Sequence, residues 1–193
     1  MADVYAAKKY DHLLGIEGLS DTLMTNHFTL YEGYVKNANL IIEKLRGTEI
    51  ASPEHAELQR RFGWEWNGMR LHEFYFGGMT KEKNELGEGL LLQKLIECFG
   101  SFEKWSKNFT TIGAMRGMGW AILYEDLHTG ELLNVWVNEH DMGHLAGSRI
   151  LVNMDVFEHA FMIDYGTKRA DYIETFMRSI DWKEIERRYQ EGK

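Results

Sequence analysis

Two long stretches of helical periodicity, joined by a short connection, limit the folds open to this sequence more than any other feature. In the first stretch, residues 19–46, apolar or aromatic side chains and one histidine recur every three or four positions, which predicts a helix with one buried stripe. The stripe consists of Leu23, His27, Tyr31, Tyr34, Ala38 and Ile41. Ser20 is suited to cap this helix at its start, and Gly47 is suited to end it.

The second stretch begins at Ser52-Pro53-Glu54. A capping serine, a proline in the first turn and an acid near the positive end of the helix dipole together predict a helix start. The helix continues through Trp64 and His72 to about Tyr75, and Gly77-Gly78 ends it. Because two long helices with a short connection form an antiparallel hairpin, we expect the first half of the chain to be a helical hairpin.

The second half of the chain mixes helical and strand patterns. Residues 81–89 are polar and contain glycine, which is typical of a linker, so we expect a helical hairpin domain at 1–84 and an α+β domain at 85–193. Helical patterns cover residues 90–99, 102–109, 157–163, 169–178 and 182–189, and strand patterns cover 120–125, 132–138 and 149–154. Asp181 and Glu184 have the spacing of a capping box for the last helix. The predicted fold class is α+β.

Composition excludes several classes of protein. The 193 residues include one proline and 13% aromatic side chains, which argues against low-complexity and disordered chains. The longest apolar run, Trp120 to Tyr124, is far shorter than the roughly 18 residues of a membrane span, so we expect no membrane partner. The first ten residues lack the apolar segment of a signal peptide, and the single Cys98 allows no intrachain disulfide. We therefore expect a cytoplasmic protein.

The charge balance limits the partners. Lysine and arginine number 22 against 30 aspartates and glutamates, so the net charge is 22 − 30 = −8. We expect no nucleic-acid partner, because nucleic-acid-binding proteins normally present a basic face. An anionic substrate would be repelled by this net charge and would need a local positive patch to reach its site.

Three histidines and one aspartate are candidate metal ligands. His27 and His72 lie on the apolar stripes of the two long helices, and His159 follows Asp155 by four positions. Each has an ordinary interpretation as well: a histidine on an apolar stripe is usually a core or boundary residue, and Asp155 with Glu158 has the form of a capping box. Taken together, three imidazoles and one carboxylate without a thiolate suit iron, manganese or zinc. Spacing alone leaves open whether the four side chains meet.

The segment Asp155-Val-Phe-Glu-His-Ala-Phe-Met-Ile-Asp-Tyr resembles the C-terminal signature D-V-W-E-H-A-Y-Y-x-D-Y of the iron/manganese superoxide dismutase family. Further matches follow the family's order along nearly the whole chain: Tyr34-Val-Lys-Asn-Ala-Asn, Asn67-Gly before His72, Phe99-Gly-Ser-Phe-Glu, Gly117-Met-Gly-Trp-Ala, Arg169-Ala-Asp-Tyr-Ile, Phe176, Trp182 and Arg188-Tyr189. The resemblance implies a helical hairpin domain followed by an α+β domain with a three-stranded antiparallel sheet.

The resemblance also implies roles for individual residues. The positions that match the family's four metal ligands are His27, His72, Asp155 and His159, with water or hydroxide as a fifth ligand and one iron or manganese ion per chain. Tyr34 matches the tyrosine at the mouth of the substrate funnel, and Trp120 matches a wall of the cavity. Glu158 matches a glutamate that contacts the partner subunit's ligand histidine, which implies a homodimer with Glu158 and His159 at the interface. Arg169 and Lys36 are candidates for the positive patch.

The sequence departs from the family's pattern at the glutamine that hydrogen-bonds the metal-bound solvent. In one branch of the family this glutamine lies four residues before the second ligand histidine, where this chain has Gly68; in the other it lies in a run that matches Asn138-Glu139-His140-Asp141. We expect His140 to fill the space over Gly68 and to donate to the metal-bound solvent. The alternative is that His140 is an ordinary loop residue.

Three smaller departures concern the surroundings of the site. The family's second histidine, four residues after the first ligand, is Tyr31 here, and its usual tyrosine partner is Met162, so both members of that pair are replaced. Tyr34 lies seven rather than eight residues after His27, which leaves open whether Tyr31 or Tyr34 gates the funnel. Phe157 replaces a tryptophan beside the metal, which should reduce packing there.

The sequence therefore favours a homodimeric superoxide dismutase that converts superoxide to dioxygen and hydrogen peroxide. The alternative is a non-enzymatic structural or metal-binding member of the same fold, for which we would expect at least one of the four ligands to be lost. A different metalloenzyme, such as a hydrolase or oxygenase, ranks last because the ligand set leaves one open position and no evident pocket for an organic substrate. The native metal and the choice between dimer and tetramer stay open.

Overall fold

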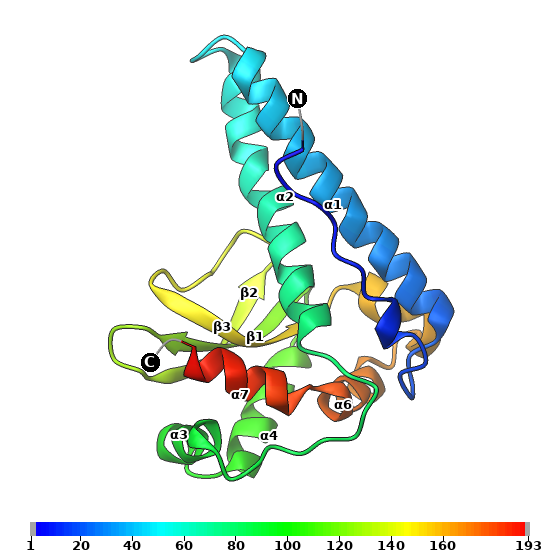
Figure 1. Ribbon diagram of the computed structural model, residues 1–193, viewed down its shortest axis with the longest axis vertical. Helices are drawn as coiled ribbons and strands as arrows, with labels where there is room; N and C mark the ends of the chain where they lie inside the picture. Colours follow the sequence, from blue (N-terminus) through cyan, green and yellow to red (C-terminus); the bar gives the residue numbers. More distant parts are fainter. Residues whose placement is uncertain (1–2, 192–193) are drawn as a thin grey trace.

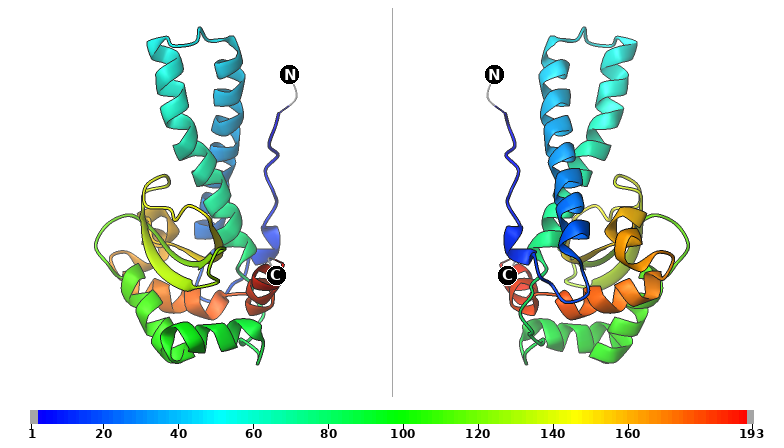
Figure 2. Two further views of the ribbon diagram at one scale, coloured as in Figure 1. Left: turned by 90° about the vertical axis from the view of Figure 1, so that its left-hand side faces the viewer. Right: turned by 90° about the vertical axis from the view of Figure 1, so that its right-hand side faces the viewer.

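The first half of the chain forms the predicted helical hairpin. The structure is a computed structural model that describes residues 3–191. Helix α1 spans Asp21–Gly47, and α2 spans Pro53–Gly77. The two helices project from the body of the molecule, and the segment that precedes α1 lies along them (Figure 1 and Figure 2).

Both long helices begin where the sequence predicts a cap. The Ser20 hydroxyl accepts the backbone N–H of Leu23 at 3.1 Å, and the Ser52 hydroxyl accepts that of His55 at 3.1 Å. Each serine thereby satisfies one of the N–H groups that a helix start leaves without a partner. The buried face of α1 follows the predicted stripe, except that Tyr34 is only half-buried.

The second half of the chain surrounds a three-stranded antiparallel sheet with helices, as predicted. The sheet has the order β2-β1-β3, with β1 at Gly119–Asp126, β2 at Leu132–Asn138 and β3 at Ser148–Asp155. The remaining helices are η1 (Asp11–Leu13), α3 (Leu90–Phe99), α4 (Phe102–Gly113), η2 (Glu158–Ala160), α5 (Met162–Tyr165), α6 (Arg169–Ser179) and α7 (Trp182–Gln190). Helix α4 packs on β1 and β2, and α2 packs on β3. The predicted α+β fold is confirmed.

The hairpin and the sheet meet where β3 ends. The side-chain amide of Asn153 in β3 donates to the backbone carbonyl of Leu71 in α2 at 2.7 Å, which ties the strand to the helix. Trp120 of β1 pairs with Asp155, the last residue of β3. Because η2 also contacts α1, the chain after β3 turns directly against the hairpin. This junction brings together four segments that are far apart in the sequence.

One apolar core joins the two halves of the chain. Residues 81–89 contain no helix or strand, as a linker should. Phe76 of α2 and Trp105 of α4, on either side of this linker, are both fully buried in the same apolar cluster. The domain boundary at 84/85 stays a prediction. Among the helices of residues 3–191, none combines the length and the apolar character that crossing a membrane requires.

One prediction about the residues after β3 is wrong, and one alternative interpretation of them is excluded. The helix expected over 157–163 is split into η2 and α5, because Phe161 between them has a φ of −146°, which is not helical. The capping box of Asp155 and Glu158 does not form, because Asp155 is part of β3. Its Oδ1 atom instead accepts the backbone N–H of Phe157 at 2.8 Å.

Two further predictions are partly right. Helix α4 continues to Gly113 instead of ending at residue 109. Asp181 caps α7 by accepting the N–H groups of Lys183 and Glu184 at 3.1 and 3.3 Å. The Glu184 carboxylate does not reach back to complete a capping box, because it pairs with Arg187 and Arg188 farther along the same helix.

Candidate metal centre

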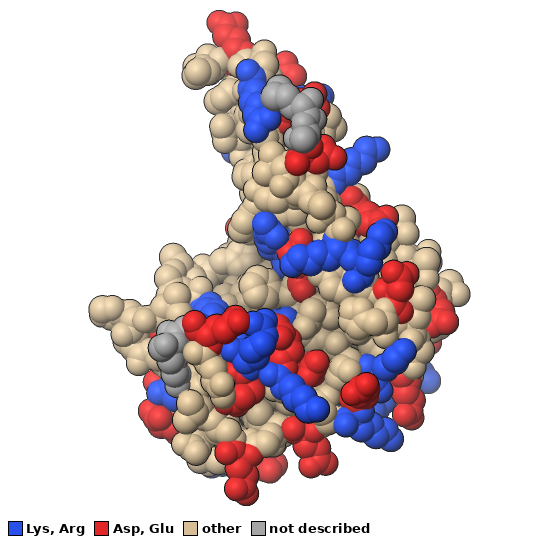
Figure 3. All heavy atoms as spheres, in the orientation of Figure 1, with Lys and Arg blue, Asp and Glu red and all other residues tan. Residues whose placement is uncertain are grey.

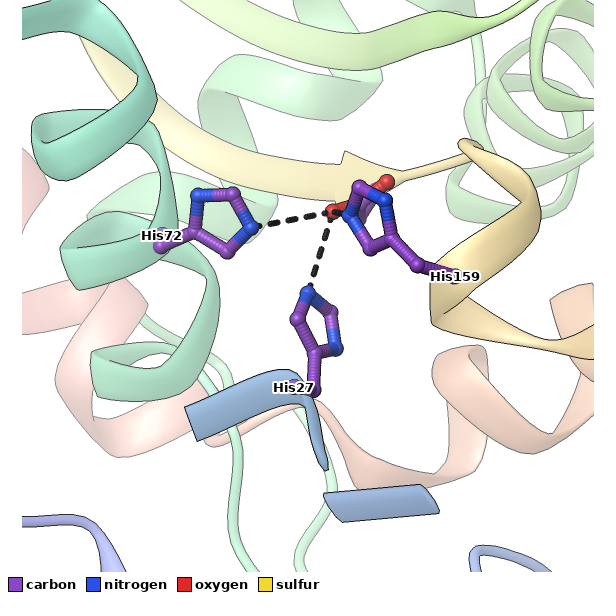
Figure 4. Close-up of side chains that lie close together, drawn as sticks. His27, His72 and His159 are labelled. Carbon is purple, nitrogen blue, oxygen red and sulfur yellow. Dashed lines mark hydrogen bonds and ion pairs between the residues drawn. The ribbon is translucent and has the colours of Figure 1, made fainter. Parts of the chain in front are cut away.

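The four predicted ligands lie together at the junction of the hairpin and the sheet. His27 comes from α1, His72 from α2, Asp155 from the end of β3 and His159 from η2. Each offers one ligand atom, and these atoms all lie within 4.8 Å of one another. Figure 4 shows the three histidine rings pointing toward one another around a carboxylate oxygen. The convergence that spacing left open is therefore present in the fold.

One oxygen atom lies at the middle of this cluster. Asp155 Oδ2 is 3.1 Å from His159 Nε2, 3.3 Å from His27 Nε2 and 3.6 Å from His72 Nε2. His27, His72 and Asp155 have completely buried side chains, whereas 28% of the His159 side chain is exposed. His159 is thus the ligand with exposed side-chain surface, and the other three are shielded from solvent.

The buried imidazoles have polar atoms without hydrogen-bond partners. The atoms without a partner are both ring nitrogens of His27 and Nε2 of His72. A buried polar atom without a partner costs about 1–3 kcal/mol, so such atoms are rare unless something else binds them. Unpartnered imidazole nitrogens beside a carboxylate, with no thiolate among them, fit a bound iron, manganese or zinc ion.

The protonation states also suit ligation. Burial lowers the pKa of His27, and it lowers that of His72 well below the usual value, so both rings are neutral at pH 7. Burial alone would raise the pKa of Asp155, but the neighbouring His159, which also hydrogen-bonds the carboxylate, and the nearby His27 hold it well below its usual range. Neutral imidazoles and an ionised carboxylate are the forms that bind metals.

Hydrogen bonds outside the cluster orient two of the ligands. The Nδ1 atom of His72 lies 2.6 Å from the backbone carbonyl of Gly68; it therefore carries the proton and leaves Nε2 with a free lone pair. Asp155 is held twice: its Oδ1 accepts the N–H of Phe157, and its backbone carbonyl accepts the hydroxyl of Tyr172 at 2.6 Å. These contacts leave Nε2 of His72 and Oδ2 of Asp155 facing the middle of the cluster.

His140, Tyr34 and Trp120 form a hydrogen-bonded group beside the ligands. The indole N–H of Trp120 donates to Nδ1 of His140 at 3.1 Å, and the Tyr34 hydroxyl lies 2.7 Å from Nε2 of His140. Because Nδ1 accepts, the neutral ring carries its proton on Nε2 and donates it to Tyr34. Burial lowers the pKa of His140 to about 4, so the ring is neutral at pH 7. His140 is fully buried, although it lies in the loop after β2.

The space over Gly68 is filled by Tyr34, so the prediction that His140 fills it is wrong. A Cβ atom added to Gly68 would lie 2.6 Å from a ring carbon of Tyr34, closer than side chains tolerate. The Tyr34 ring also stacks on His72, with ring centroids 5.2 Å apart. Because Nε2 of His140 is engaged by Tyr34, donation from His140 to a metal-bound solvent stays a prediction.

Tyr31 and Tyr34 differ in their hydrogen-bond partners. The Tyr31 hydroxyl accepts the backbone N–H of Lys8 at 2.9 Å and donates to the Glu73 carboxylate at 3.2 Å. Tyr31 is thus fully buried between α1, α2 and the N-terminal segment. Of these two tyrosines, Tyr34 lies nearer to a ligand: its ring centroid is 5.2 Å from that of His72, against 6.5 Å for Tyr31. Met162, the other half of the replaced family pair, is 45% exposed.

The two candidates for the positive patch have different surroundings. Lys36 projects from the side of α1 opposite His27 and lines a hollow with the N-terminal segment. Arg169 is anchored by donating to the backbone carbonyls of Met115 and Gly117 at 2.6 and 2.8 Å. The face in Figure 3 carries acidic and basic side chains side by side, without an extended area of one sign.

Sequence reasoning assigned Phe157 to the site but missed Arg61 and Trp64 beside His140. The Trp64 ring lies edge-on to His140 with centroids 4.7 Å apart, and the guanidinium of Arg61 lies 4.9 Å from the centre of the Trp64 ring. Phe157 stacks between His140 and His159, at 4.7 and 5.2 Å from their centroids. A signal for the first two was available, because Arg61, Trp64, Gly68 and His72 follow one another at helical intervals along one face of α2.

A second histidine holds the loop that carries His140. Nε2 of His144 lies 2.8 Å from the backbone carbonyl of His140, and its Nδ1 lies 2.7 Å from the hydroxyl of Tyr124 in β1. His144 therefore donates to the His140 carbonyl and accepts from Tyr124. The same loop has Glu139 at a φ of +52°, an unusual conformation for a residue with a side chain. The loop is thus fixed from the central strand of the sheet.

Comparisons with known proteins agree with this site and fold. Residues 87–188 match the family described as "Iron/manganese superoxide dismutases, C-terminal domain". The chain is 34% identical over 177 residues to "Superoxide dismutase [Mn] 2" of Haloferax volcanii, which covers 90% of this chain and 88% of that protein. It is 33% identical over 201 residues to "Superoxide dismutase [Fe]" of Aquifex pyrophilus, which covers 98% and 93%.

A third relative extends the match to another organism. "Superoxide dismutase [Fe]" of Methanothermobacter thermautotrophicus is 33% identical over 177 residues, which covers 89% of this chain and 86% of that protein. Relatives named for manganese and relatives named for iron thus match at similar identity, over nearly their whole length. The chain belongs to the iron/manganese superoxide dismutase family.

Proposed function

We propose that this protein is a superoxide dismutase that holds one iron or manganese ion per chain and converts superoxide to dioxygen and hydrogen peroxide. The observation that carries the proposal is the buried cluster of His27, His72, Asp155 and His159, whose unpartnered nitrogens face one carboxylate oxygen. A non-enzymatic member of the fold is disfavoured because no ligand position is lost. The names of the relatives support iron and manganese over zinc.

Each residue of the cluster would have a defined task. Three imidazoles and one carboxylate would hold the ion, and the carboxylate would offset one of its positive charges. The chemistry that iron or manganese supplies when bound is one-electron transfer, which oxidises one superoxide to dioxygen and reduces another to peroxide. The overall reaction consumes two superoxide ions and two protons and gives one dioxygen and one hydrogen peroxide. The protein must therefore deliver protons to the cavity.

The geometry supports Tyr34 as the residue that delivers a proton. His140 donates its Nε2 proton to the Tyr34 oxygen, so the hydroxyl proton of Tyr34 is left to point toward another acceptor. Burial raises the pKa of Tyr34, which keeps the hydroxyl protonated at neutral pH. Trp120 fixes His140 in the required tautomer by donating to its Nδ1 atom. His140 and Trp120 would thus act by holding the Tyr34 hydroxyl in place.

The surface beside the cluster supports a homodimer. Glu158 is exposed next to the partly exposed His159, and the neighbouring apolar side chains of Met162 and Ile163 are 45% and 52% exposed. We propose that Glu158 contacts the partner's His159 across a twofold axis, and that a second copy of the chain covers these apolar side chains. The single cysteine supports a cytoplasmic location, and the net charge of −8 supports a protein without nucleic-acid partners.

Separate reconstitution with iron and with manganese tests the proposal. We expect about one metal ion per chain and acceleration of superoxide decay with at least one of the two metals. The matched control is His55→Gln, which changes a histidine on α2 outside the cluster and should leave the activity intact. Metal-loaded protein that does not accelerate superoxide decay, with the four ligands intact, would contradict the proposed function.

A further inference from the structure

An acidic protein with an anionic substrate needs a positive charge placed at its site. The net charge is −8; Lys36 lines a hollow with the N-terminal segment, and Arg169 is engaged with the backbone carbonyls of Met115 and Gly117. Two side chains of α2 lie beside His140: the Trp64 ring contacts it, and the guanidinium of Arg61 lies over the Trp64 ring. Arg61 thus brings a positive charge to this side of the site.

Arg61 is held in place by a carboxylate that is turned inward. Its Nε atom donates to Glu65 at 2.9 Å; the Arg61 side chain is 52% exposed and that of Glu65 only 5%. The other Glu65 oxygen accepts the side-chain amide of Asn37 at 3.2 Å. Although the ion pair is neutral as a whole, its positive end faces water and its negative end faces the hairpin core. An approaching anion therefore meets the guanidinium first.

A continuous row of side chains connects Arg61 to the ligand cluster. The guanidinium lies 4.9 Å from the centre of the Trp64 ring, and the Trp64 ring lies 4.7 Å from His140. His140 in turn contacts Tyr34, which stacks on His72. The row leads from an exposed cation to a ligand without a gap. The charge of Arg61 also acts at the inner end of the row: burial lowers the pKa of His140 and Arg61 adds to this shift, whereas burial raises the pKa of Tyr34 and Arg61 opposes that rise.

We propose that Arg61 is the cationic side chain that draws superoxide to the Trp64–His140–Tyr34 side of the metal centre. It acts as a steering and positioning residue, since it does not touch the reacting atoms. The identity of the anion rests on the proposed function, whereas the attraction of a small monovalent anion to this spot does not. Two measurements therefore test the inference, and the result of the second does not depend on catalytic activity.

The test variant removes the cation without changing the net charge. The double substitution Arg61→Gln with Glu65→Gln replaces the ion pair by two amides and leaves no buried carboxylate without a partner. The chain offers a matched control in the neighbouring pair of Arg60 and Glu57, which are 3.2 Å apart with side chains 78% and 71% exposed. The control variant is Arg60→Gln with Glu57→Gln.

The first measurement is the ionic-strength dependence of kcat/KM for the metal-loaded protein. Electrostatic steering raises association rates by about 10- to 1,000-fold at low salt. We expect kcat/KM of the test variant to fall about tenfold at low ionic strength and to lose most of its salt dependence. The control variant should stay within about twofold of the wild type at every ionic strength. Arg61→Lys, which keeps the charge, should recover most of the loss.

The second measurement needs no catalytic activity. Iodide and acrylamide both quench tryptophan fluorescence, but only iodide is charged. Trp64 is one of three tryptophans that are partly exposed, with Trp66 and Trp136, in the described part of the chain. In the metal-free full chain we expect the iodide quenching constant of the test variant to fall by roughly a third relative to the control variant, with the acrylamide constant unchanged. Trp64→Phe should abolish the difference.

The outcomes separate the inference from the proposed function. A specific loss of both iodide quenching and kcat/KM in the test variant supports Arg61 as the steering residue. Equal behaviour of the test and control variants in both measurements overturns it, as does an unchanged kcat/KM in an active enzyme. If the wild type does not dismutate superoxide but the iodide difference persists, the proposed function fails and anion attraction by Arg61 stands.

Discussion

The ligand cluster and the group beside it use their polar atoms in opposite ways. In the cluster, both nitrogens of His27 and one nitrogen of His72 have no hydrogen-bond partner. In the neighbouring group, both nitrogens of His140 are hydrogen-bonded, one to Trp120 and one to Tyr34. Both groups are buried and both draw side chains from the hairpin and from the α+β half, so burial and origin do not explain the difference.

This difference shows which part of the site has partners for its buried polar atoms without a bound ion. Buried polar groups in proteins are normally paired, and unpaired ones need an explanation. The cluster is incomplete without an ion, whereas the group of His140, Tyr34 and Trp120 is already held by its own hydrogen bonds. We therefore expect substitutions in the cluster to abolish metal binding, and substitutions in the neighbouring group to change rates, metal preference and stability.

The largest effect should come from the cluster itself. His72→Gln removes one of the unpartnered nitrogens, and we expect the metal content to fall about tenfold or more and superoxide dismutation to fall to background. Metal loading should raise the melting temperature of the wild type, because a ligand that binds only the folded state stabilises it, and it should not raise that of His72→Gln. Elemental analysis and thermal unfolding measure both effects. A variant that retains a full metal ion would show that the cluster is not the binding site.

The second effect sharpens the role assigned to the neighbouring group. His140→Gln keeps one donor and one acceptor but changes the strength and position of the donor to Tyr34. We expect activity to fall by about 10-fold with at least one metal and the ratio of iron-loaded to manganese-loaded activity to change, while metal content stays near that of the wild type. Steady-state assays of both metal forms measure this. An unchanged ratio would mean that His140 does not influence metal preference.

The third effect tests the contact between Gly68 and Tyr34. Gly68→Ala puts a methyl group where the Tyr34 ring lies, which should lower the free energy of unfolding by about 1–3 kcal/mol and weaken the bond between Tyr34 and His140. Gly63→Ala is the matched control on the same helix, because no side chain lies near its added Cβ. It should stabilise the protein by up to about 1 kcal/mol. Urea unfolding distinguishes the two, and a neutral Gly68→Ala would contradict the packing described here.

The smallest effect is a pH dependence of stability. Burial lowers the pKa of His140 from 6.5 to about 4, so between these values the unfolded chain binds a proton that the folded chain does not. The free energy of unfolding should therefore fall as the pH is lowered through this window, and the contribution of His140 should be fully present above pH 6.5. Between pH 7 and pH 5 we expect a loss of about 1–2 kcal/mol from this residue. The loss should be absent in His140→Gln, and an equal slope for both proteins in urea unfolding would contradict it.

Much of the fold and the ligand set could be predicted, because those features repeat along the chain or lie close together in it. The helical stripe carries His27, the caps at Ser20 and Ser52 set the helix starts, and the four-residue spacing links Asp155 to His159. Local patterns such as these need no knowledge of tertiary packing. The ligand set was identified through its resemblance to a known family, and its convergence is a property of the fold.

The features that could not be predicted depend on contacts between distant segments. The Tyr34 ring fills the space over Gly68 only because α1 and α2 approach closely there, and one-dimensional spacing does not reveal this approach. The same reason applies to His144, whose partner Tyr124 lies in another element.

The most direct test of the account is a crystal structure of the iron-loaded protein with anomalous scattering recorded at the iron edge. We predict a single anomalous peak about 2.1 Å from Nε2 of His27, His72 and His159 and from Oδ2 of Asp155. An ion bound elsewhere, or bound by fewer than these four side chains, would contradict the account.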